Sequence, residues 1–162
     1  MRVLGVDPGL RTTGWAVLDA RGALVDCGRW RVRPGEPAAT TVALARGLRA
    51  VIDRHRPEVL GVELQFVNFK RGHQDRAGLA ALRGALTLVA SEAGLRVVGV
   101  QPQAAKAALA FGGADKAAMV AHANARFGLE LTQREADVAD ALGVALAGRR
   151  ELAPLTQVAM SW

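Results

Sequence analysis

The most constraining feature of this sequence is a run of three short apolar segments at its start, separated by tight-turn residues. The segments are RVLGVD at 2–7, GWAVLD at 14–19 and ALVDCGRWRV at 23–32. Pro8-Gly9 follows the first segment and Arg21-Gly22 precedes the third, and Gly and Pro are the strongest turn formers. Because strands joined by short turns pair antiparallel, the sequence predicts a sheet that begins with three antiparallel strands. The third segment alternates imperfectly, so its register stays open.

The spacing of the apolar residues changes after this start. Over 38–55 they recur every three or four positions, which is typical of an amphipathic helix. Further helices are expected near 75–93, after Pro102, and near 116–127 and 134–149, with buried strands at 59–64 and 96–100. Strands connected through helices pair parallel. The sequence therefore predicts an α/β fold with a mixed five-stranded sheet, three antiparallel strands and then parallel strands, flanked by helices.

Glycine and proline are scattered along the chain instead of forming a linker, and the sequence contains no internal repeat. A length of 162 residues is enough for one domain with a sizeable core. We therefore expect a single domain over 1–150. The segment 151–162 contains Pro154 and has little periodicity, and we expect this tail to be mobile or to pack across a neighbouring element.

The charge of the chain points to a polyanionic partner. Lys and Arg total 21 against 15 Asp and Glu, a net charge of +6, and such an excess influences association more than fold. The excess lies wholly in residues 1–83, which hold 14 cations and 8 anions. Because 18 of the 21 cations are Arg and Ala is abundant, compositional bias accounts for part of it. An anionic ligand is expected on the first half of the chain.

Two further features exclude other classes of protein. Cys27 is the only cysteine, so an intramolecular disulfide and a cysteine-based zinc cluster are excluded. No apolar stretch reaches the roughly 18 to 20 residues that cross a membrane, and Asp7 interrupts the first apolar run before it could serve as a signal-peptide core. A soluble cytoplasmic protein with no membrane partner is expected.

Four acidic residues stand out because packing does not explain their positions. Asp7 closes an apolar strand, and Glu63 lies within another, LGVELQF. Asp137 and Asp140 lie three residues apart on a predicted helix and share a face. The buried stripe predicted for that helix consists of Val138, Leu142, Ala145 and Leu146. A carboxylate in a buried strand is costly unless it is paired, protonated or bound to a cation.

Taken together, the four carboxylates favour a divalent-metal site. Their oxygens suit Mg²⁺ and Mn²⁺, and a set of them can gather two cations that clamp a phosphate for hydrolysis. Each residue also has an explanation that involves no function. Asp7 could form a turn, Glu63 could pair with an arginine, and the helix pair could be exposed charges. Spacing alone does not show that the strands and the helix converge.

Three motifs that contain these acidic residues resemble a known family. VLGVDPGLRTTGWAVL resembles the opening of RuvC-type Holliday junction resolvases, GVELQF resembles their second acidic strand, and ADVADALGVAL resembles their final acidic helix. The order and approximate spacing agree over residues 1–148. Each motif is moderately specific, and the three in sequence are strongly so.

The resemblance implies an RNase H-like fold with Asp7, Glu63, Asp137 and Asp140 as the catalytic, metal-binding residues. It implies two Mg²⁺ ions per active site, with Mn²⁺ also supporting activity. A homodimer would introduce paired symmetric nicks in a four-way DNA junction and leave 5′-phosphate and 3′-hydroxyl ends. Branch-migration proteins of the RuvA and RuvB type are the further partners that the resemblance implies.

The resemblance also implies DNA-binding residues. Phe66 occupies the position of a family phenylalanine that stacks on bases at the junction centre, and Phe69 is the rival because this loop is slightly longer than usual. The surrounding basic residues expected to contact DNA are Lys70, Arg71, His73 and Arg76. Aromatic stacking on a base contributes about 1 to 3 kcal/mol. The alternative is a purely structural role, in which one of the two phenylalanines only covers the core.

Lys106 and Lys116 match two lysines of the family, with one residue fewer between them. In a chain that otherwise prefers Arg, lysine at both positions suggests a role for a compact ammonium, in phosphate contact or in charge stabilisation. Ordinary exposed helix lysines are the alternative. The histidines at 55, 73 and 122 complete no obvious metal set.

Two other functions remain open from the sequence. One is a YqgF-like nuclease of RNA processing with the same broad fold, although such proteins lack the GVELQF arrangement and the closing acidic run. The other is a junction-binding module without catalysis, which would be expected to lack a carboxylate. The segment GLAALRG and Leu64 depart from the family pattern, which puts the sequence preference of cleavage in doubt.

Overall fold

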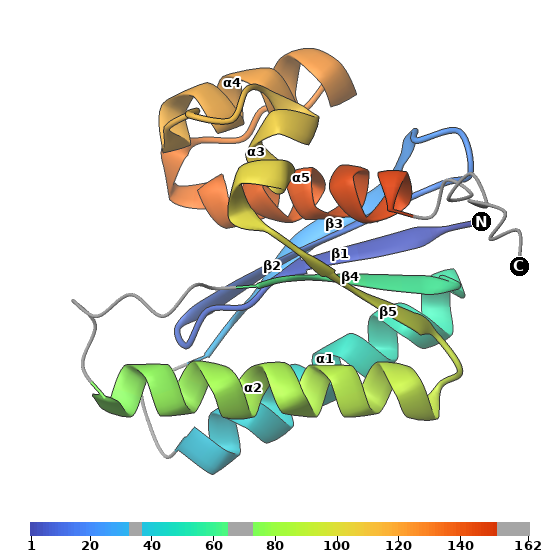
Figure 1. The fold of residues 1–162 in the computed structure, drawn as a ribbon, viewed down its shortest axis with the longest axis vertical. Coiled ribbons are helices and arrows are strands. Elements are labelled where there is room, and N and C mark those ends of the chain that lie inside the picture. Colours follow the sequence, from blue (N-terminus) through green and yellow to red (C-terminus); the bar gives the residue numbers. More distant parts are fainter. Residues whose placement is uncertain (33–36, 65–72, 152–162) are drawn as a thin grey trace, which may run out of the picture.

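The computed structural model describes residues 1–32, 37–64 and 73–151. For Pro37 and residues 73–76 it describes the backbone only. A five-stranded mixed sheet lies at its centre (Figure 1). In spatial order its strands are β3 (Leu24–Arg31), β2 (Thr12–Leu18), β1 (Val3–Asp7), β4 (Val59–Glu63) and β5 (Arg96–Val100). The first three strands pair antiparallel, and β4 pairs parallel with β1 and with β5. The predicted mixed sheet is confirmed.

Helices cover both faces of the sheet (Figure 1). One face carries α1 (Pro37–His55) and α2 (His73–Glu92). The other face carries α5 (Ala136–Arg150), with α3 (Pro102–Leu109) and α4 (Lys116–Phe127) packed outside it and the short 3₁₀ helix η1 (Gln133–Glu135) leading into it. The element order and bounds agree with the sequence-based prediction to within a few residues. No helix in the described ranges is long and apolar enough to span a membrane.

The two faces of the sheet bury separate cores. Alternate residues of β2 show the division, because Val17 packs toward α1 and α2 whereas Ala16 and Leu18 pack toward α5. A shift in register between Val17 and Leu18 interrupts the pairing of β2 with β3. This irregularity explains why the third segment does not alternate cleanly in the sequence.

Helix α5 is buried more completely than its sequence indicates. The predicted stripe of four residues is buried, but so are residues on its other sides, including Ala139, Ala141, Val144 and Ala147. The outer side is covered as well, because Gly143 faces Ala105 of α3 and Met119 of α4. The predicted stripe is confirmed as buried, but the buried surface of α5 is larger than that stripe because a second layer of helices covers its outer side.

Glycines on the sheet allow α5 to lie directly against it. Gly5, Gly14 and Gly61 lie on adjacent strands and face the helix. A Cβ atom at Gly14 would come within 1.9 Å of the backbone oxygen of Asp137, and one at Gly5 within 2.4 Å of that of Ala141. Side chains at these positions would hold the helix away from the sheet.

Candidate active site

Asp7 and Glu63 lie side by side at one edge of the sheet. Each is the last residue of its strand, and β1 and β4 are parallel neighbours in which Val6 pairs with Val62. Side chains alternate between faces along a strand, and Gly5 and Gly61, two residues earlier, both face α5. Both carboxylates therefore project toward α5.

The first turns of α5 bring the other two carboxylates to the same edge. Asp7 pairs with Gly14 of β2, and the backbone of Asp137 lies directly over Gly14. Asp140 follows one helical turn later. The four acidic residues selected from the sequence thus meet at the junction of β1, β4 and α5, which spacing could not show.

A cleft of about 650 Å³ opens at this junction. Asp7, Glu63, Asp140 and Lys116 line it, together with Leu79 and the β1–β2 turn at 8–12. Asp137 is not among the lining residues, and its Oδ2 atom is buried without a hydrogen-bond partner among the described residues. A buried carboxylate oxygen without a partner is costly and marks a place where a ligand is missing or strain is stored.

The carboxylates influence one another strongly. Burial raises the pKa of Asp7 well above its ordinary value, and the negative charges of its neighbours raise it further, in the order Glu63, Asp140 and Asp137. The charge of Lys116 opposes these effects on the pKa of Asp7. Without a bound cation, these carboxylates cannot all ionise easily at the same time.

Cationic side chains of this site partly offset that charge. Burial raises the pKa of Glu63 and Asp140, and another carboxylate raises each of them as well. Lys106 lowers both pKa values, Lys116 lowers that of Asp140, and Arg83 lowers that of Glu63. Lys116 is exposed at the start of α4, and Lys106 is half-buried on α3. Both lysines singled out from the sequence therefore face the acidic cluster.

This donor set suits hard divalent cations. Carboxylate oxygens are the groups that Mg²⁺ and Mn²⁺ prefer, and a cation would relieve both the mutual repulsion and the unpartnered oxygen of Asp137. In the part of the chain that the structure describes, no three His, Cys, Asp or Glu side chains already stand in a complete ligand arrangement.

Most of the predicted DNA-binding loop lies outside the described residues. Phe66, Phe69, Lys70 and Arg71 lie outside the described residues. His73 and Arg76 lie in the first turns of α2, where only the backbone is described. The roles expected of these six residues stay predictions.

The histidines in the described part of the chain lie away from the cleft. His55 is buried on the other face of the sheet, where its Nε2 atom is 3.0 Å from Oδ2 of Asp26 and its ring contacts Trp15. His122 is exposed on α4, with its ring against that of Phe111. Neither contributes to the acidic cluster.

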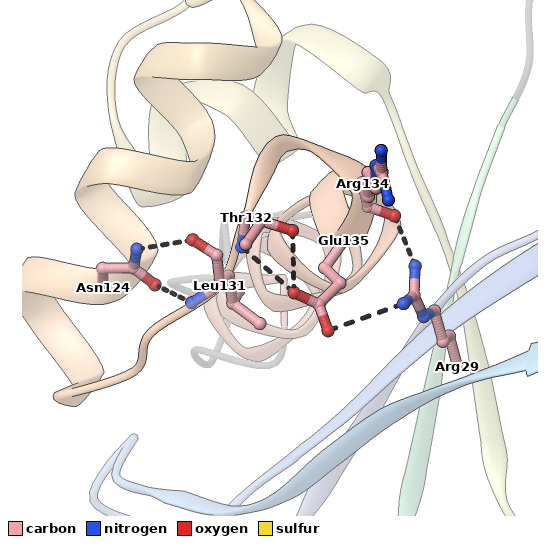
Figure 2. Close-up of polar contacts among 6 residues, drawn as sticks. All are labelled: Arg29, Asn124, Leu131, Thr132, Arg134 and Glu135. Atoms are coloured by element: carbon pink, nitrogen blue, oxygen red, sulfur yellow. Dashed lines mark hydrogen bonds and ion pairs between the residues drawn. The ribbon is translucent and has the colours of Figure 1, made fainter.

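The sequence reasoning missed the contacts that fix the start of α5 (Figure 2). Glu135 accepts hydrogen bonds from the backbone and the hydroxyl of Thr132, at 3.1 and 3.0 Å, in a capping box. Arg29 of β3 donates to the backbone oxygen of Arg134 and lies 3.5 Å from Glu135. The pattern Thr-x-x-Glu at 132–135 was the available signal for the cap. Nothing in the sequence indicates that Arg29 reaches it.

We expect Arg29→Ala to destabilise the fold by about 2 kcal/mol, because it removes a hydrogen bond and an ion pair from a partly buried group. Arg49→Ala is the matched control. Its ion pair with Glu92 is shorter, at 2.8 Å, but well exposed, so a loss of about 0.5 kcal/mol is expected. Urea unfolding of the two variants measures both values, and equal losses would contradict a special role for Arg29.

Comparisons with known proteins agree on one family. Residues 3–148 match the family model described as crossover junction endodeoxyribonuclease RuvC. Crossover junction endodeoxyribonuclease RuvC of Chloroflexus aggregans is 37% identical over 151 residues, covering 90% of this chain and 91% of that protein. The protein of the same name from Synechococcus sp. strain WH7803 is 38% identical over 153 residues, covering 91% and 97% of the two chains.

Solved structures show the same similarity. T. thermophilus RuvC in complex with a Holliday junction substrate superposes with a TM-score of 0.78 and 32% identity, covering 91% of this chain and 92% of that one. The yeast mitochondrial Holliday junction resolvase Ydc2 has a TM-score of 0.61 at 13% identity, covering 91% and 77% of the chains. The second likeness concerns the fold alone.

Proposed function

Since this chain belongs to the RuvC family of crossover junction endodeoxyribonucleases, we propose that it resolves four-way DNA junctions by paired symmetric nicks at the acidic cleft. The RNase H-like fold and the endodeoxyribonuclease class follow from the family. The observation that carries the assignment of the site is the meeting of four carboxylates from β1, β4 and α5, three of which line one cleft. Asp7, Glu63, Asp137 and Asp140 are the proposed catalytic residues.

The proposed site holds divalent cations, two Mg²⁺ ions for each active site, with Mn²⁺ as a substitute. When bound, the ions would supply activation of water and stabilisation of the leaving oxygen. The chain supplies the oxygens that would hold them, and the unpartnered Oδ2 atom of Asp137 supports this part of the proposal. The raised pKa of Asp7 supports it too, because a nearby cation would favour the ionised carboxylate.

The chain's own cations act on the substrate. Lys116 lines the cleft, and Lys106 and Arg83 lie near enough to affect Glu63. We expect the lysines to contact the non-bridging oxygens of the scissile phosphate and to offset the negative charge that develops there. In the proposed hydrolysis, water attacks phosphorus and the bond to the 3′ oxygen breaks. The 3′ oxygen leaves with a proton, which gives a 5′-phosphate and a 3′-hydroxyl.

Symmetric cleavage calls for two active sites. A four-way junction has two-fold symmetry, so a homodimer would present one cleft to each of two equivalent strands. The proposal therefore includes a homodimer in the bacterial cytoplasm that works with branch-migration proteins of the RuvA and RuvB type. Phe66 or Phe69 is the residue proposed to stack on bases at the junction centre.

The test uses purified protein, a labelled synthetic junction and a linear duplex of the same sequence, each with Mg²⁺, Mn²⁺ or chelator. Symmetric nicks that DNA ligase can seal, in the junction alone and only with a cation, are the expected result. Tight junction binding with no cleavage under any cation would instead identify a non-catalytic junction binder. Equal activity on both DNAs, or a preference for structured RNA, would favour the RNA-processing alternative.

A further inference from the structure

The edge strand β3 carries arginines on the same face as the acidic cluster. Asp7 pairs with Gly14, and Gly14 pairs in turn with Arg29, so these three residues form one row across the sheet. Arg31 pairs with Thr12, which lines the cleft. Since Trp30 packs in the core under α1 and α2, its neighbours Arg29 and Arg31 project to the opposite face, where α5 lies.

Three exposed arginines surround this corner of the molecule. Arg11 lines the cleft, Arg31 ends β3, and Arg134 precedes α5. We call these three residues the β3 patch. Glu135 lies close enough to Arg31 for its pKa to be affected, and it is already held by Thr132 and Arg29. Among the described residues, no carboxylate forms an ion pair with any of these three arginines.

The pKa of Glu135 is consistent with this arrangement. It lies below the usual range, mainly because Thr132 donates hydrogen bonds to the carboxylate, and the charges of Arg29 and Arg31 lower it further. Arg31 is thus near the start of α5.

The distance of β3 from the carboxylates is comparable with the distance spanned by a few successive phosphates on DNA. Neighbouring strands lie about 4.8 Å apart, so β3 is about 10 Å from β1 and Asp7. A DNA strand carries one phosphate for every 3.4 Å or so of duplex axis. With one phosphate at the carboxylates, a phosphate one to three nucleotides away would lie over β2 and β3.

We propose that the β3 patch binds the phosphodiester backbone of the cleaved DNA strand, one to three nucleotides from the scissile phosphate. Arginine suits this role because its guanidinium group donates paired hydrogen bonds to phosphate oxygens. The inference rests on the proposed function, since it takes the acidic cleft as the position of the scissile phosphate. It assigns DNA contacts to residues outside the basic loop and outside the two lysines.

The first test measures junction binding by the full chain carrying Asp7→Asn, so that cleavage does not interfere. Arg31→Ala and Arg134→Ala are each expected to lower the slope of log affinity against log salt by about 1, the value for one lost phosphate contact. Arg96→Ala is the matched control, because Arg96 is also exposed but lies at the start of the opposite edge strand. Unchanged slopes in both patch variants would overturn the proposal.

The second test locates the contact with neutral methylphosphonates, placed singly at the three phosphates on each side of the cut. One substitution is expected to weaken binding several-fold with Arg31 present and to have no further effect in Arg31→Ala. Additive losses at every position would overturn the patch. Cleavage of the same junction by the unsubstituted protein is measured in parallel. If the protein cleaves the junction but no methylphosphonate effect depends on Arg31, the patch alone is rejected. If one such effect depends on Arg31 but the junction is not cleaved, the patch is supported and the proposed resolvase activity is rejected.

Discussion

Asp7→Asn is expected to lower junction cleavage by about 10³-fold or more, to leave junction binding intact and to raise the melting temperature near neutral pH. Cleavage falls because the variant loses a carboxylate at the centre of the proposed cation site, where the stabilisation amounts to several kcal/mol. Binding persists because the phosphate contacts lie elsewhere and one negative charge near the DNA is removed. Gel-based cleavage, anisotropy titration and thermal unfolding measure the three effects.

The expected gain in stability follows from the raised pKa of Asp7 in the folded state. An acid whose pKa is raised on folding favours the folded state while both states are protonated. This contribution is lost as the pH rises from the ordinary pKa of the unfolded chain through the raised folded value. The stabilisation by Asp7→Asn should therefore be largest near pH 8 and nearly absent near pH 3. Each kcal/mol corresponds to a shift of about 2–4 °C in a domain of this size.

The control is Asp53→Asn, the same chemical change at an exposed position of α1, on the other face of the sheet. It should alter neither cleavage nor melting temperature. Mg²⁺ should also raise the melting temperature of the unsubstituted protein more than that of Asp7→Asn, because binding to the folded state alone stabilises it. An Asp7→Asn variant that cleaves normally, or melts lower at every pH, would contradict the proposed role of Asp7.

Gly14→Ala is expected to destabilise the fold by about 3 kcal/mol and to abolish cleavage, although every carboxylate is retained. The new Cβ atom would lie 1.9 Å from the backbone oxygen and 2.3 Å from the carbonyl carbon of Asp137. Both contacts are with backbone, so no side chain can move aside, and overpacking of this kind typically costs 1–3 kcal/mol or more. The start of α5 must shift, and Asp137 and Asp140 shift with it. Urea unfolding and junction cleavage measure the two losses.

Gly84→Ala is the matched control. Gly84 lies within α2, and a Cβ atom there would meet no other atom within 4 Å. Because alanine favours a helix over glycine by about 1 kcal/mol, this variant should be as stable as the parent or slightly more so. If Gly14→Ala behaved like Gly84→Ala, the close packing of α5 on β2 would not be what positions the acidic residues.

Local patterns were enough to predict the elements of this protein. Apolar residues at a helical or a strand spacing reflect burial of one face, so the bounds of α1, β4 and β5 could be predicted closely from 38–55, 59–64 and 96–100. The four carboxylates could also be selected from the sequence, because charges such as Glu63 are costly in an apolar strand. Family membership followed from the order of three motifs, all of them local in sequence.

Tertiary packing alone decided how those elements form a site. Periodicity indicates that a face is buried but not what covers it, so the covering of the outer side of α5 by α3 and α4 was not predictable. The meeting of Asp7 with Asp137 depends on glycines that let a distant helix touch the sheet. Arg29 and Arg31 became relevant only through strand register, which places them beside the start of α5. Contacts between residues far apart in sequence leave no local pattern, because they depend on how faces pack and not on what each face contains.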